Sequence, residues 1–94
     1  MRPLAQAVPD ALADLLRDVP LSAGKVSFAW RAAVGSGLER ATTVRLDGTV
    51  LVVEAASPQW AREVTRSSGL ILSRLNTLLG RGTVTRLLVR EPKP

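Results

Sequence analysis

The dipeptide Asp47-Gly48 lies between two runs of β-forming residues, and it constrains the fold more than any other feature of the sequence. Asp-Gly between such runs is a strong local signal for a β-hairpin with a two-residue loop, because both loop residues need positive φ. The two strands are expected at residues 41–46 and 49–56. This register places Leu46 opposite Thr49 and Val44 opposite Leu51.

Alternation along these strands gives the hairpin one apolar face and one mixed face. The apolar face carries Val44, Leu46, Leu51 and Val53. The mixed face carries Thr43, Arg45, Val50, Val52 and Glu54. Since the second strand is apolar on both faces, it is expected at the centre of the sheet.

Three helices are expected around the hairpin, at residues 9–20, about 22–35 and 57–80. Each begins with residues that suit a helix N-terminus, namely Pro9-Asp10, Ser22 and Ser57-Pro58. Gly80 is a suitable residue to end the third and longest helix. The apolar arc of that helix carries Trp60, Val64, Ile71, Leu75 and Leu78.

A third strand is expected at residues 83–90, with Leu87 and Val89 toward the core and Arg86 and Arg90 outward. The resulting order, α-α-β-β-α-β, predicts an α+β protein with a three-stranded sheet and helices packed on one face. A chain of 94 residues allows one domain. That domain is expected at residues 9–90, after a flexible leader at 1–8 and before a short tail at 91–94.

The chain has neither histidine nor cysteine. Their absence excludes disulfides, zinc fingers and every nucleophilic triad that relies on those residues. Gly24-Lys25 lacks the leading glycine and the following hydroxyl of a phosphate-binding loop. We therefore expect a protein that is not an enzyme, with no catalytic residue, no metal and no cofactor.

Three carboxylates recur at four-residue spacing along the first expected helix: Asp10, Asp14 and Asp18. This row is either a solvated face or a contact surface for a basic partner protein. Phe28 points away from the apolar face of the second helix. It either packs against the first helix or, if exposed, contacts a partner.

Both tryptophans, Trp30 and Trp60, lie on apolar arcs and are expected in the core. Aromatic residues make up only 3% of the chain. A sheet that reads unpaired bases by stacking needs exposed aromatic side chains. The sequence therefore does not indicate such a platform.

The basic residues carry more information, because Lys and Arg total 13 against 8 Asp and Glu, for a formal charge of +5. Seven arginines fall on the polar side of the third helix, the outer sheet face and the glycine-flanked loop: Arg62, Arg66, Arg74, Arg81, Arg86, Arg90 and Arg45. Grouped cations are typical of a phosphate-contacting surface. The alternatives are ordinary solvated faces, and an arginine content set by the base composition of the genome.

Two blocks of sequence resemble a known family. The first is FAWRAAVGSGL at residues 28–38. The second runs from DGTVLVV at 47–53 through SPQWAREV at 57–64 to LNTLLG at 75–80, and then through residues 84–90. This ordered combination, from about residue 12 to residue 90, is similar to the DciA family of bacterial replication proteins.

The resemblance implies a KH-like fold and a non-enzymatic protein that binds DNA, contacts the DnaB-type replicative helicase and assists its loading onto single-stranded DNA. The chain departs from this pattern in two respects. It has Gly35-Ser-Gly37 and Gly80-Arg-Gly82, but not the GxxG loop with which KH domains clamp a nucleic-acid backbone. Many members also carry a long flexible extension, whereas this chain ends four residues after Arg90, so it would be a reduced version if binding resides there.

Two other functions stay open from the residues alone. An RNA-binding KH-like module would use the same basic surface, and a pure protein-interaction domain would use the acidic row and Phe28. The N-terminus does not resemble a signal peptide, and no stretch is apolar enough to span a membrane. We expect a cytoplasmic, nucleoid-associated protein whose partners are the helicase and DNA, with no membrane and no small-molecule substrate.

Overall fold

The structure is a computed structural model that describes residues 11, 14, 15 and 19–91. Its elements are helix α2 (Ala23–Val34), helix α3 (Ser36–Arg40), strand β1 (Thr42–Asp47), strand β2 (Val50–Ala55), helix α4 (Pro58–Arg66), helix α5 (Ser68–Leu79) and strand β3 (Arg86–Arg90). Most of the first expected helix lies outside the described residues, although Ala11, Asp14 and Leu15 are helical.

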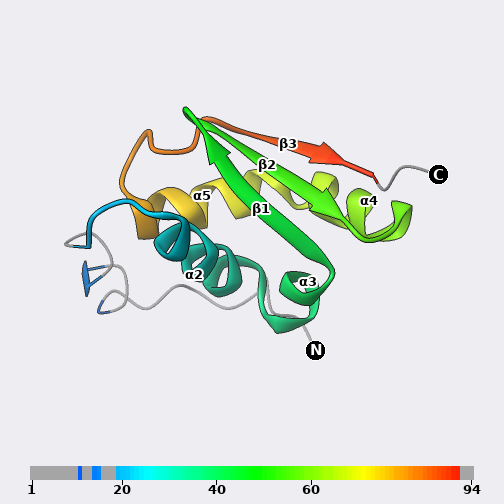
Figure 1. Cartoon of the computed structure of the whole chain (residues 1–94), viewed down its shortest axis with the longest axis horizontal. Coiled ribbons are helices and arrows are strands. Elements are labelled where there is room, and N and C mark those ends of the chain that lie inside the picture. The colour runs from blue at the N-terminus through cyan, green and yellow to red at the C-terminus, as the bar shows by residue number, and fades with distance from the viewer. Residues whose placement is uncertain (1–10, 12–13, 16–18, 92–94) are drawn as a thin grey trace.

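The three strands form one mixed sheet in the order β1-β2-β3 (Figure 1). Strands β1 and β2 are antiparallel, whereas β2 and β3 are parallel. Buried residues of α2, α4 and α5 join Leu51 and Val53 of β2 in one hydrophobic core. The α+β class is therefore confirmed, β2 is central as expected, and the arrangement is compatible with a KH-like fold.

The hairpin register differs by two residues from the expected one. Leu46 lies opposite Leu51, so the loop is Gly48-Thr49 rather than Asp47-Gly48. Only Gly48 of this loop has positive φ, 62°, as in turns that take glycine at the first loop position. Because a shift of two residues preserves the alternation, the two faces of the hairpin are the ones expected.

The long helix expected at residues 57–80 is two helices, α4 and α5, that meet at Ser67. Ser67 has φ −97° and ψ 9°, and its amide still donates to the carbonyl of Glu63 at 3.1 Å. Ser67, Ser68 and Gly69 are all weak helix formers, which favours an interruption here. A shared apolar periodicity cannot reveal such a break, because both helices face the same core.

Helix α2 follows the prediction, because Ser22 caps it by accepting a hydrogen bond from the amide of Lys25 at 3.1 Å. Its predicted apolar face is buried, and Trp30 is 2% exposed. The indole Nε1 of Trp30 donates to the hydroxyl of Thr42 at 2.8 Å, and that hydroxyl donates to the carbonyl of Leu38 at 2.8 Å. One buried indole thus links α2 to α3 and to the start of β1.

Candidate nucleic-acid interface

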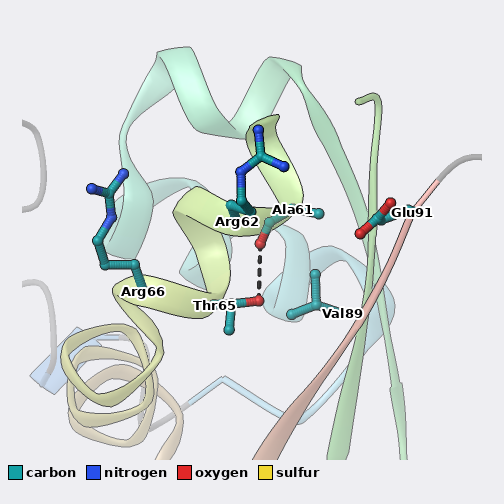
Figure 2. Close-up of a pocket in the computed structure, with 6 residues that line it drawn as sticks. All are labelled: Ala61, Arg62, Thr65, Arg66, Val89 and Glu91. Atoms are coloured by element: carbon teal, nitrogen blue, oxygen red, sulfur yellow. Dashed lines mark hydrogen bonds between the residues drawn. The ribbon is translucent and has the colours of Figure 1, made fainter. Parts of the chain in front are cut away.

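Strand β3 pairs only with β2 among the described residues, and its outer edge lies beside α4, with a groove of about 500 Å³ between them (Figure 2). The groove is lined by Ala61, Arg62, Thr65, Arg66, Val89 and Glu91. Ser57 fixes the start of α4 by accepting a hydrogen bond from the amide of Trp60 at 3.3 Å, and Pro58 occupies the first turn. The sequence signals that begin α4 therefore also position the wall of this groove.

Small side chains form the floor of the groove, where Val89 of β3 faces Ala61 and Thr65 of α4 (Figure 2). The hydroxyl of Thr65 donates to the carbonyl of Ala61 at 2.9 Å, so it is satisfied within its own helix. The guanidinium groups of Arg62 and Arg66 project away from this floor. The groove thus combines an uncharged floor with cationic groups on the helix beside it.

Strand β3 itself contributes two more arginines, on the face of the sheet that points away from the helices. Arg86 and Arg90 are exposed at the two ends of β3, paired in register with Val50 and Glu54 of β2. Four residues of a strand span about 13 Å. We define the β3-edge surface as Arg62 and Arg66 on α4 together with Arg86 and Arg90 on β3.

Acidic side chains moderate the charge of the β3-edge surface. Arg66 forms an ion pair with Glu63 one turn earlier in α4, and both side chains are solvent-accessible. Exposed pairs of this kind contribute little to stability. Glu54 lies beside Arg90 in register, and Glu91 lines the groove. The surface is therefore basic through the number of its arginines, not through an absence of carboxylates.

The loop before β3 carries Arg81, which is exposed. The flanking Gly80 and Gly82 have φ of 110° and 80°, which side chains other than glycine rarely adopt. The hydroxyl of Thr83 donates to the carbonyl of Leu79 at 3.1 Å. Arg81 therefore sits on a short loop that is tied back to the end of α5, in the segment that leads into β3.

The side-chain amide of Asn76 fixes the far end of this loop. Its Nδ2 donates to the carbonyl of Val84 at 2.8 Å, and its Oδ1 accepts from the amide of Val84 at 3.0 Å. The side chain of Val84 is buried in the core. Nothing in the spacing of Asn76 along the chain signals this contact with a residue eight positions later.

Arg74, one of the seven predicted phosphate contacts, does not belong to this surface. Its side chain is 8% exposed, and Nη1 donates to the carbonyl of Ala33 at 3.2 Å. Ala33 lies in the last turn of α2, where carbonyls lack helical partners and a cation is favourable. Arg74 thus joins α5 to the end of α2, which leaves it outside the β3-edge surface.

Arg45 is exposed, but it lies on β1 at the opposite edge of the sheet, in register with Val52. Two strand spacings, about 10 Å, separate β1 from β3. The structure therefore places Arg62 and Arg66 on the helix beside the β3 edge, Arg86 and Arg90 on β3 itself, Arg81 on the loop that enters β3, and Arg45 on the opposite edge strand.

Trp60 was expected in the core, but its side chain is 38% exposed, so that expectation is wrong. It lies in the first turn of α4, whereas the buried residues of that helix are Ala61 and Val64. The other four residues of the predicted apolar arc, Val64, Ile71, Leu75 and Leu78, are completely buried, so the prediction fails only in the first turn of α4.

Of the residues considered for partner contact, Phe28 is 47% exposed on α2. Asp14 is also exposed, while Asp10 and Asp18 lie outside the described residues. Within the described part of the chain, no group of His, Cys, Asp or Glu could hold a metal ion. No helix among those residues is long and apolar enough to cross a membrane.

Together these features define a small α+β domain with a KH-compatible arrangement and a basic groove at one sheet edge. The chain belongs to the DciA family, since residues 3–89 match the family model described as "Dna[CI] antecedent, DciA". This is a family of bacterial DNA replication proteins. The resemblance of the two sequence blocks is thereby confirmed.

A curated relative agrees with the family assignment. The chain is 34% identical over 70 residues to a UPF0232 protein of Mycolicibacterium smegmatis, which covers 73% of this chain. The matched region is 36% of the relative, so the chain spans about a third of that protein. No solved structure matches the chain.

Proposed function

We propose that this protein is a non-enzymatic adaptor that binds DNA along the β3-edge surface and docks on the DnaB-type replicative helicase to assist its loading. It acts in the cytoplasm at the nucleoid. The DNA-binding half rests on the geometry of the β3 edge, and the helicase half rests on membership of the DciA family.

The observation that carries the DNA-binding half is the placement of arginines on both sides of one strand edge. Arg62 and Arg66 lie on α4 beside the edge, while Arg86 and Arg90 lie on β3 itself. Phosphate binding needs grouped cations but no base-specific geometry. Guanidinium groups also pair with phosphate oxygens through two parallel hydrogen bonds.

The test is a titration of labelled single-stranded and duplex oligonucleotides, followed by fluorescence anisotropy. We expect affinity to be highest near about 50 mM salt and to fall steeply as salt rises, because counterions are released on binding. The variant R62A/R66A/R86A/R90A should bind far more weakly and show a shallower salt dependence. The control variant R31A/R40A removes two exposed arginines of α2 and α3, and it should bind as the parent protein does.

A loss of affinity per arginine removed that is equal in the control and in the β3-edge variant would show that net charge alone drives binding, and would refute the assigned surface. An RNA probe of equal length serves as competitor in the same assay. A clear preference for RNA would replace the adaptor with an RNA-binding module.

The helicase half is tested by a pulldown with the cognate replicative helicase. Phe28 is proposed as a contact because it is an exposed aromatic side chain, and aromatic residues are enriched in protein interfaces. We expect F28A, and D10A/D14A/D18A in the acidic row, to weaken capture while DNA affinity is unchanged. Capture that is lost with the β3-edge arginines instead would place both partners on one surface.

A further inference from the structure

The sheet has a second edge, on β1, which pairs with no strand other than β2 among the described residues. The amide of Ala56 donates to the carbonyl of Ala41 at 2.8 Å, so this pair carries ladder hydrogen bonds. Hydrogen-bonded and non-bonded pairs alternate along an antiparallel ladder. Thr42, Val44 and Leu46 therefore turn their backbone N–H and C=O groups away from β2, toward the outer edge.

One half of this edge borders a mainly apolar groove of about 400 Å³ between β1 and the first turn of α2. Its lining residues are Leu21, Ser22, Ala23, Val26, Val44, Arg45, Leu46 and Gly48. Leu21 is 55% exposed. Val44 and Leu46 are half-buried although they face the core, whereas Val53 and Leu51, which lie opposite them on β2, are completely buried.

The other half of the edge is occupied by contacts within the chain. The Thr42 hydroxyl is held between the Trp30 indole and the Leu38 carbonyl. No residue before Val44 on β1 lines the groove. The open part of the edge therefore runs from Val44 to Gly48, and its centre is Leu46.

On the part of β1 from Val44 to Gly48, the face that points away from the core carries one positive and one negative side chain. Arg45 and Asp47 are exposed and lie two residues apart, so they share the face of β1 that points away from the core. If two copies of β1 pair antiparallel about Leu46, Arg45 of each copy lies directly opposite Asp47 of the other. Opposite charges that face one another across strands are stabilising, and like charges are destabilising.

We propose that the β1 edge is a self-association surface, at which two copies of this chain pair their β1 strands about Leu46 into one six-stranded sheet. The interface is isologous, with a two-fold axis at Leu46. Leu46, Leu21 and Val26 of both copies fill the two grooves, and the outward backbone groups of Val44 and Leu46 complete the ladder. An unprotected edge strand is a ready template for such pairing, and β1 contains neither proline nor lysine.

Pairing through β1 leaves both β3-edge surfaces at the outer ends of the joined sheet. Five strand spacings, about 24 Å, would separate the two β3 strands. Self-association is independent of DNA binding, so failure of one proposal would not entail failure of the other.

The test measures the molar mass of the full chain by sedimentation equilibrium over a wide concentration range, with a charge swap across the interface. We expect the parent protein to form a dimer, and R45D and D47R each to raise the dimer dissociation constant about tenfold, because two symmetric attractions become repulsions. The double variant R45D/D47R should restore the parent value, and an equimolar mixture of the two single variants should form a heterodimer.

The control R86D makes the same change on the other outer strand and should leave the dissociation constant unchanged. The fluorescence of the buried Trp30 and far-ultraviolet circular dichroism verify that each variant is folded. A parent protein that is monomeric at every concentration would overturn the proposal. So would a dimer that R45D does not weaken, or one that the double variant does not restore.

Discussion

The two edges of the sheet have the same exposed backbone but different neighbours. Beside β3, helix α4 contributes Arg62 and Arg66 above a floor of small side chains. Beside β1, the first turn of α2 contributes Val26 and the preceding Leu21, and the groove there is mainly apolar. The helix packed next to an edge, together with the side chains of the strand itself, thus determines whether that edge suits a polyanion or a second strand.

The largest expected effect is a loss of DNA affinity when the arginines beside the β3 edge are replaced by acidic residues. Reversal of the groove arginines in R62E/R66E should lower DNA affinity about a hundredfold at low salt, because two attractions to phosphates become repulsions. Anisotropy titrations measure this change. The matched variant R31E/R40E carries the same change in net charge, and an equal loss there would contradict a localised binding edge.

The next largest effect concerns the loop that positions β3. In N76L the amide and carbonyl of the buried Val84 lose their hydrogen-bond partner, and unsatisfied buried groups are costly. We expect the free energy of unfolding, measured in urea, to fall by about 2 kcal/mol. The nearby T77A changes an exposed residue of the same helix and should alter it by less than about 0.5 kcal/mol.

A smaller effect distinguishes a structural arginine from those of the β3-edge surface. R74M keeps the aliphatic stem but removes the hydrogen bond to the end of α2, which should lower the free energy of unfolding by about 1.5 kcal/mol. DNA affinity, measured on the folded variant, should stay within about threefold of the parent value. A stable variant that no longer binds DNA would restore Arg74 to the interface.

Local signals in the sequence were sufficient for most of the fold. Ser22 and Ser57 mark two helix starts because their hydroxyls satisfy free amides, and the hairpin faces follow from alternation alone. The register of the hairpin was not accessible, since Asp-Gly suits more than one loop and only Gly48 adopts positive φ. The break at Ser67 was hidden because both helices present apolar residues to one core.

The candidate site was predictable in its residue type but not in its location. Spacing places Arg74 at the flank of the polar arc, and the side chain reaches the carbonyl of Ala33, 41 residues earlier in the chain. Trp60 and Trp30 have similar sequence surroundings, but only Trp30 has a hydrogen-bond partner for its indole in the described core. The order of the strands in the sheet separates Arg45 from Arg86, because it places β1 and β3 at opposite edges. Spacing along the sequence does not give that order.

The central claim is that DNA binds the β3 edge and leaves the β1 edge free. Amide chemical shifts of isotope-labelled protein, followed during titration with a single-stranded oligonucleotide, test it most directly. We predict that the shifts concentrate in α4, in β3 and in the loop around Arg81, while Val44, Leu46 and the first turn of α2 do not change. Shifts concentrated along β1 and α2, with β3 unaffected, would contradict the assignment of the two edges.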